Sequence, residues 1–114
     1  MDKLAQYRGY VQKVLLDYAE FRKPTRPDDE LALQAIFDPK RDRYQLIYVG
    51  WYQGDRVYGP VLQLDIINGK IWLQLNGTED DITQDLMELG VPRQDIVLGF
   101  HSPYMRQFTD FAVC

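Results

Sequence analysis

The sequence has few of the residues that small enzymes use for catalysis. It contains one histidine, His101, and one cysteine, Cys114. A single histidine excludes a two-histidine metal site and severely weakens a zinc cluster or a nucleophile–histidine–acid triad. The G-x-S-x-G motif of serine-dependent α/β-hydrolases is also missing, and Gly90-Val-Pro has too few glycines for a phosphate loop. We therefore predict no catalytic residue, no metal and no cofactor.

Long apolar runs are missing as well. No window approaches the ~18 uninterrupted apolar residues of a membrane span, and Met1-Asp2-Lys3 does not open a signal-peptide core. A lone cysteine cannot form an intramolecular disulfide, which fits a reducing compartment. With 114 residues, 46% of them hydrophobic, the chain can bury a core of its own. These features predict one cytoplasmic domain over residues 1–114.

The sequence also has no excess of positive charge. The net charge is −4, and residues 61–114 carry three Lys and Arg against eight Asp and Glu, a net −5. This sign opposes the phosphate field of nucleic acid, so we expect no direct, specific DNA or RNA binding. The most basic turn, Lys40–Arg43, is interleaved with acids and leaves a β-ribbon DNA contact as an alternative.

What the chain does contain is strand-forming sequence. The run from Tyr44 to Asn76 predicts three antiparallel strands, and Glu30–Phe37 predicts one before them. Asn68-Gly69 is the preferred dipeptide of a type I′ hairpin turn. If Ile67 opposes Lys70, the strands pair Ile66 with Ile71, Leu64 with Leu73, Leu62 with Leu75, Asp65 with Trp72, Gln63 with Gln74 and Val61 with Asn76.

Two segments have helical signals. Apolar residues at helical spacing predict a helix from Asp2 to Phe21. Thr78-Glu-Asp-Asp81 resembles a capping box and predicts a second helix that ends at Gly90. Ile96–Phe100 reads as a buried strand before a mixed tail. The fold class is thus α+β: an antiparallel sheet of four or more strands, an N-terminal helix, and a second helix after the fourth strand.

Both faces of this predicted sheet are apolar, although antiparallel sheets often have one polar face. Alternation predicts one face of Ile36, Ile47, Val49, Trp51, Tyr58, Leu62, Leu64, Ile66, Ile71, Leu73 and Leu75. The opposite face then collects Leu31, Leu33, Phe37, Tyr44, Leu46, Tyr48, Tyr52, Val57, Val61 and Trp72. The two helices could cover both faces, or sit together on one. We favour the second arrangement, which leaves Tyr44, Tyr48, Tyr52 and Trp72 for a partner or a second copy of the chain, and so predicts a possible homo-oligomer.

The second helix has an acidic stripe. Asp81, Asp85 and Glu88 lie at i, i+4 and i+7, and no Lys or Arg on that helix offsets them. Like charges at this spacing destabilise a helix slightly, so helix stability does not explain the stripe. Three carboxylates along one helix face do not converge on a metal. The stripe is either a solvated surface or a docking face for a basic protein.

Three long segments, YQLIYVGW, RVYGPVLQLDIINGKIWLQLNGTEDDI and ELGVPRQDIVLGFHSPYMRQFTDFAV, resemble the XisI family, the fdxN element excision controlling factors of cyanobacteria. The resemblance spans almost the whole chain. It implies an XisI-like fold and a role in controlling a programmed DNA rearrangement, in which a separate recombinase performs the DNA recombination. It also implies an XisH-like protein as partner and transfers no catalytic residue.

Together these features predict a non-enzymatic accessory factor that acts by protein–protein contact. The predicted partner-binding residues are those of the acidic stripe and of the apolar face: Asp81, Asp85, Glu88, Tyr44, Tyr48, Tyr52 and Trp72. Two alternatives stay open. One is a DNA-binding accessory factor that uses Lys40–Arg43, and the other is a small enzyme centred on His101 and Arg106.

Overall fold

In a computed structural model that describes residues 2–22 and 30–114, the chain begins with helix α1, Lys3–Phe21. The Asp2 carboxylate caps it by accepting a hydrogen bond from the Leu4 amide at 3.0 Å. One stripe of the helix is buried, and it consists of Tyr7, Val11, Val14 and Leu15. The predicted N-terminal helix is therefore confirmed.

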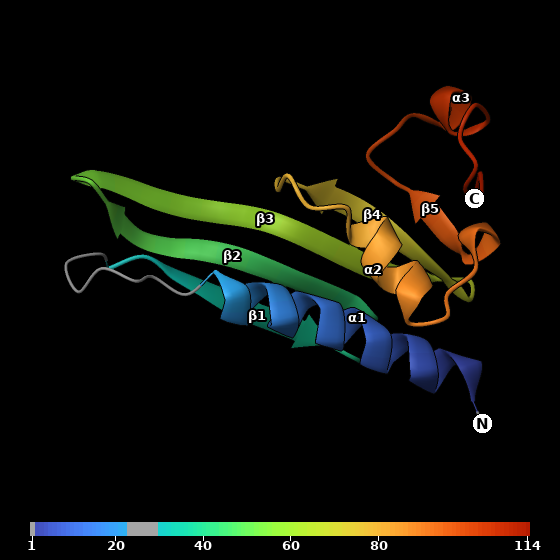
Figure 1. The fold of residues 1–114 in the computed structure, drawn as a ribbon, viewed down its shortest axis with the longest axis horizontal. Coiled ribbons are helices and arrows are strands. Elements are labelled where there is room, and N and C mark those ends of the chain that lie inside the picture. The colour runs from blue at the N-terminus through green and yellow to red at the C-terminus, as the bar shows by residue number, and fades with distance from the viewer. Residues whose placement is uncertain (1, 23–29) are drawn as a thin grey trace.

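The described residues form a five-stranded sheet in the order of the chain (Figure 1). Its strands are β1 (Ala32–Asp38), β2 (Arg43–Tyr52), β3 (Asp55–Ile67), β4 (Lys70–Asn76) and β5 (Ile96–Leu98). The first four pair antiparallel, whereas β5 pairs parallel to β4. A parallel neighbour needs a crossover, which runs through helix α2 (Ile82–Glu88) and the short 3₁₀ helix η1 (Arg93–Asp95). The chain continues into a short helix α3, Pro103–Arg106.

The hairpin at Asn68-Gly69 is confirmed. Both residues have positive φ, 52° and 77°, as a type I′ turn requires. The predicted pairs hold from Ile67–Lys70 to Leu64–Leu73. Beyond them β4 contains a β-bulge with Gln74 as its extra residue, so the predicted pairs Leu62–Leu75, Gln63–Gln74 and Val61–Asn76 are wrong. Leu62 instead stands opposite Asn76.

A second bulge decides which residues share a face. Leu46 pairs with Leu62 but Ile47 pairs with Pro60, which leaves Val61 as the extra residue of β3. Directly paired residues point to the same side of a sheet. Tyr44 and Leu46 therefore lie on the same face as their partners Leu64 and Leu62, not on the opposite face as predicted.

Helices α1 and α2 both cover this one face of the sheet (Figure 1). Tyr7, Val11 and Leu15 of α1 share a buried core with sheet residues Tyr44, Leu46, Leu62, Leu64, Ile71 and Leu73 and with Ile82 and Leu86 of α2. The expected arrangement, two helices on one face, is thus confirmed. We call this the helix face and the other the open face. The open face, however, mixes the two predicted sets. Strands β1 to β3 contribute residues of the first set, Ile36, Ile47, Val49, Trp51 and Tyr58, and β4 contributes Trp72 of the second set.

Part of the open face is covered by residues 99–113. The Arg106 guanidinium of α3 lies 4.8 Å from the centre of the Trp72 ring, a cation–π contact. Gly99 passes so close to β4 that a Cβ there would come within 2.4 Å of the Gln74 side chain. Ala112 then bonds to Ile96 through its amide at 2.9 Å. The predicted strand Ile96–Phe100 is accordingly shorter and ends at Leu98. Among the described helices, none is long and apolar enough to cross a membrane.

Candidate functional site

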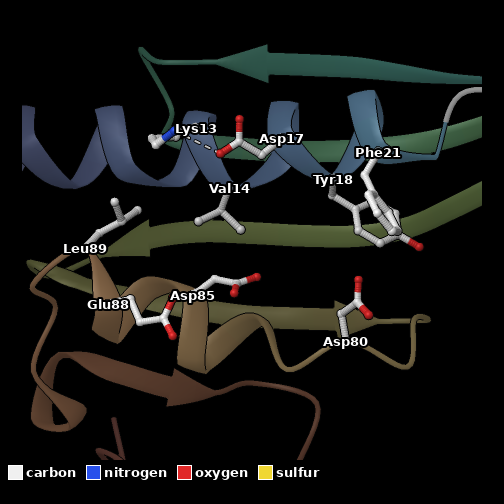
Figure 2. Close-up of a pocket in the computed structure, with 9 residues that line it drawn as sticks. All are labelled: Lys13, Val14, Asp17, Tyr18, Phe21, Asp80, Asp85, Glu88 and Leu89. Atoms are coloured by element: carbon white, nitrogen blue, oxygen red, sulfur yellow. Dashed lines mark hydrogen bonds and ion pairs between the residues drawn. The ribbon is translucent and has the colours of Figure 1, made fainter.

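A groove of about 330 Å³ lies between α1 and α2 (Figure 2). Its apolar walls come mainly from α1, with Leu89 contributed by the end of α2. Its charged residues come from both sides. The groove is lined by Lys13, Val14, Asp17, Tyr18, Phe21, Asp80, Asp85, Glu88 and Leu89.

The groove is acidic. Four carboxylates line it, and the one lysine among the described lining residues, Lys13, bonds to Asp17 at 2.9 Å. Figure 2 shows the Asp85 carboxylate between the two helices, below Val14. Such a site attracts a cationic group whose aliphatic part can pack on apolar walls. Within the described residues, no three carboxylate, histidine or cysteine side chains converge to hold a metal ion.

The three predicted acids of α2 differ in their roles. Asp81 is the helix N-cap: its carboxylate accepts hydrogen bonds from the Thr83 hydroxyl at 2.6 Å and the Gln84 amide at 3.2 Å. The Thr83 bond, more than any other contact, lowers the pKa of Asp81 below its ordinary value. The expectation that Thr78 caps the helix is wrong, because its hydroxyl bonds to Asn76 Oδ1 at 2.6 Å instead.

Asp85 and Glu88 line the groove, and both are also exposed to solvent. Desolvation in the groove raises the pKa of Asp85 most, and the carboxylates of Glu88, Asp80, Asp81 and Asp17 raise it further. Its ionised form is thus less stable than that of an ordinary carboxylate. An approaching cation would relieve this penalty. Glu88 accepts a hydrogen bond from the Gln84 side chain at 3.3 Å.

The four aromatic residues predicted to contact a partner are mostly not exposed. Tyr44 is fully buried under α1, and its hydroxyl donates to Asp42 at 3.1 Å. Tyr48 packs against the core, and Trp72 is half-buried beneath Arg106. Only Tyr52 of this set is largely exposed. The prediction that Tyr44, Tyr48 and Trp72 stand free on an uncovered face is wrong for two reasons. The β3 bulge places Tyr44 and Tyr48 of β2 on the helix face, whereas Trp72 of β4 is on the open face but is covered by Arg106.

The open face presents another apolar set, which sequence reasoning assigned to the core. Trp51 and Tyr58 at the β2–β3 hairpin and Ile36 on β1 are largely exposed, with Ile47 and Val49 half-buried between them. A signal for the reversal does exist in the sequence. Pro60 has no amide hydrogen for a ladder bond, and proline inside a strand marks an edge or a bulge.

Contacts at the Lys40–Arg43 turn bear on the DNA-binding alternative. Arg41 bonds to Asp38 at 2.8 Å, and Arg43 lies 3.7 Å from the buried Asp65 carboxylate. Asp42 in the same turn pairs with Arg8 of α1 at 2.7 Å. Two of the turn's cations therefore already face carboxylates, which weakens their attraction for phosphates.

His101 and Arg106, the residues of the enzyme alternative, contact each other through the His101 backbone and not through the imidazole ring. Arg106 Nε donates to the His101 carbonyl at 3.0 Å while its guanidinium stacks on Trp72. The His101 ring lies 4.5 Å from the Phe100 ring. These contacts give Arg106 a structural role in positioning residues 99–113.

A family model described as XisI protein matches residues 1–113. The chain belongs to the XisI family. None of the curated proteins compared with it matches this XisI-family chain.

Two crystal structures of proteins from Anabaena variabilis ATCC 29413 resemble this XisI-family chain. A XisI-like protein is 42% identical, with a TM-score of 0.87 over 97% of this chain and 99% of that one. The fdxN element excision controlling factor XisI is 35% identical, with a TM-score of 0.85 over 99% of this chain and 100% of that one. The predicted family and fold class are thereby confirmed.

Proposed function

We propose that this chain is a non-enzymatic controlling factor of DNA excision that acts by binding a basic protein through the acidic groove. The name of its relative from Anabaena, fdxN element excision controlling factor, supports the controlling role. The observation that carries the docking site is the groove itself, because it joins apolar walls to four carboxylates.

The charge of the molecule favours protein over DNA as the direct partner. Net charge is −4, and the groove adds a local negative field that repels phosphates. Arg41 and Arg43, which a β-ribbon contact would use, face Asp38 and Asp65. Control of a DNA rearrangement therefore works through a second protein that holds the DNA.

The groove indicates what that protein presents. Val14, Tyr18 and Leu89 offer apolar contact to the stem of a lysine or arginine, and Asp85 and Glu88 lie beside its charged head. A cation in the groove also relieves the repulsion that raises the pKa of Asp85. The partner we infer is an XisH-like protein with a basic segment on its surface.

The test measures association with an XisH-like protein by stopped flow. The double variant D85K/E88K should bind about tenfold more slowly at low ionic strength, because charge complementarity acts mainly on association rates. The difference should shrink as salt shortens the Debye length from ~30 Å at 0.01 M to ~8 Å at 0.15 M.

A matched control changes the overall charge equally without touching the groove. In D55K/D110K both replaced carboxylates are exposed and lie outside the groove lining. This variant should bind nearly as fast as the wild type. Unchanged association of D85K/E88K at low salt, or equal slowing of the control, would reject the groove as the site. Sub-micromolar, sequence-dependent binding of duplex DNA at physiological salt would instead favour the DNA-binding alternative.

A further inference from the structure

Exposed apolar side chains gather in two places on the molecule. One is the open face, where Trp51 and Tyr58 near the β2–β3 turn are exposed by 49 and 72%, and Ile36, opposite Gln45 and closer to the β1–β2 turn, by 45%. The other is the segment after β5, residues 99–113, which we call the C-terminal hook. Phe100, Tyr104, Met105 and Phe108 of the hook are exposed by 47 to 68%, and the Tyr104 and Phe108 rings contact each other edge-on at 5.3 Å.

The hook and the open face lie on the same side of the sheet. Trp72 stands between Ile71 and Leu73, whose side chains are buried on the helix face, so its own ring points to the open face. The hook covers that ring with Arg106. Along the sheet, the Trp51–Tyr58 end of the open face and the hook are far apart, since the β2–β3 turn and α3 lie near opposite ends of the long axis (Figure 1).

The combined area is large for a surface that faces water. Seven side chains about half exposed, at roughly 150–250 Å² for a fully accessible large side chain, leave roughly 500–900 Å² uncovered. The two places together can exceed the roughly 300–600 Å² of the largest apolar patch on a typical monomer, although each alone does not. A standard stable interface buries about 800 Å² on each partner, which lies within the range available here.

We propose that a second copy of this chain covers the open face and the hook in a two-fold symmetric dimer. A two-fold axis in the plane of contact turns one copy end for end over the other. The hook, raised above β4 of one copy, then lies over the bare β1–β3 region of its partner. The same contact forms twice, so one surface is sufficient for both copies.

The dimer uses the opposite side of the sheet from the acidic groove. Loss of the dimer and loss of binding at the groove are therefore independent of each other and can be observed separately. D85K/E88K should leave the dimer intact, because its changes lie between α1 and α2. Disruption of the open face should in turn leave the groove able to accept a basic partner.

Sedimentation equilibrium tests the dimer directly. Wild type should show a concentration-dependent monomer–dimer equilibrium, and Y58K/F108K should weaken it at least about thirtyfold, as for two anchoring aromatic residues. The control is L16K, which places a single lysine, half the charge added by the double variant, on a half-exposed apolar position of α1. Because Tyr58 and Phe108 are mostly exposed, the variant should fold normally by circular dichroism. Wild type that stays monomeric at millimolar concentration would overturn the proposal.

The only cysteine offers a test of the contact itself. A nitroxide on Cys114, next to the hook, is placed on an unlabelled copy and mixed with a ¹⁵N-labelled C114S copy. The nitroxide should broaden the Trp51 indole and Tyr58 amide signals of the labelled copy while Leu16 stays sharp. A dimer without this broadening would show that another surface mediates association. A monomeric wild type whose Y58K variant loses an XisH-like protein would assign the face to that partner.

Discussion

Both faces of the sheet carry large apolar side chains, but those on one face are buried and many of those on the other are exposed. On the helix face, Tyr44, Leu46 and Leu64 are completely buried beneath α1 and α2. On the open face, Tyr58 and Ile36 retain 72 and 45% of their exposure. Hydrophobicity alone therefore does not say which face is the core. The position of the covering helices does, and the bulges then decide which residues are covered.

This difference separates stability from contact. A side chain on the helix face contributes to folding because its burial removes apolar area from water. A side chain on the open face leaves that free energy available for association. The polar groove and the apolar face thus offer two binding surfaces of unlike chemistry on the two sides of one sheet.

Cavity-forming variants should give the largest contrast between the faces. Leu64→Ala should lower the free energy of unfolding by about 2–5 kcal/mol, because Leu64 is fully buried. Tyr58→Ala should change it by no more than about 0.5 kcal/mol. Urea denaturation measures both, at protein concentrations low enough for the monomer, since dimer formation would add apparent stability. Equal losses for the two variants would mean that the open face is also part of the folded core.

The sequence was sufficient to predict the hairpins, the first helix and the family. Asn68-Gly69 sets a register through local backbone geometry, and α1 has a strong apolar period, so neither depends on distant contacts. The bulges at Val61 and Gln74 were missed because each depends on how two strands fit together. One extra residue was enough to exchange the faces of Tyr44 and Ile47.

The candidate site was predictable only in part. Asp85 and Glu88 were identified from their spacing, but Asp17 was not, since it comes from a helix 60 or more residues earlier in the chain. That two helices meet across a groove is a tertiary property. Asp81 had a local signal for its true role, because it immediately precedes the helix and can cap it.

Loss of a hydrogen bond on the helix side should have an intermediate effect on stability. The Tyr7 hydroxyl donates a hydrogen bond to Asp95, and this bond joins α1 to η1. Tyr7→Phe should lower the free energy of unfolding by about 1.5–3 kcal/mol, as for other hydrogen bonds to charged groups. Thermal or urea unfolding at pH 7 measures the loss.

The pH dependence of the stability of Tyr7→Phe shows whether the loss comes from the hydrogen bond to the Asp95 carboxylate. Burial raises the pKa of Asp95, but the Lys3 ammonium and Tyr7 hydroxyl outweigh it and leave the pKa below its ordinary value. A lowered folded-state pKa gives stability that is present above the unfolded value, about 3.9, and is lost as pH falls through the folded value. Wild type should therefore lose more stability than Tyr7→Phe on acidification below pH 4. Parallel losses would assign the effect to packing instead.

Removal of one groove carboxylate should have the smallest effect, with the opposite sign. The folded-state pKa of Asp85 is raised by desolvation and by neighbouring acids, so its ionisation opposes folding. This penalty is absent below the unfolded pKa, grows as pH rises through the folded value, and is complete above it. Asp85→Asn should therefore stabilise the protein at pH 7 by about 0.2–0.5 kcal/mol, and the gain should disappear near pH 3.

The control for this variant is Asp110→Asn, which removes an equal charge outside the groove. Urea denaturation should find no comparable gain for it, and added salt should shrink the gain of Asp85→Asn through screening. Carboxylates that repel one another in an empty groove lower the stability of the folded protein, and this cost is expected of a binding site that a cation neutralises. If Asp85→Asn destabilised the protein at pH 7, the carboxylate would be a structural element of the α1–α2 contact, and only Asp17, Asp80 and Glu88 would remain to attract a basic partner.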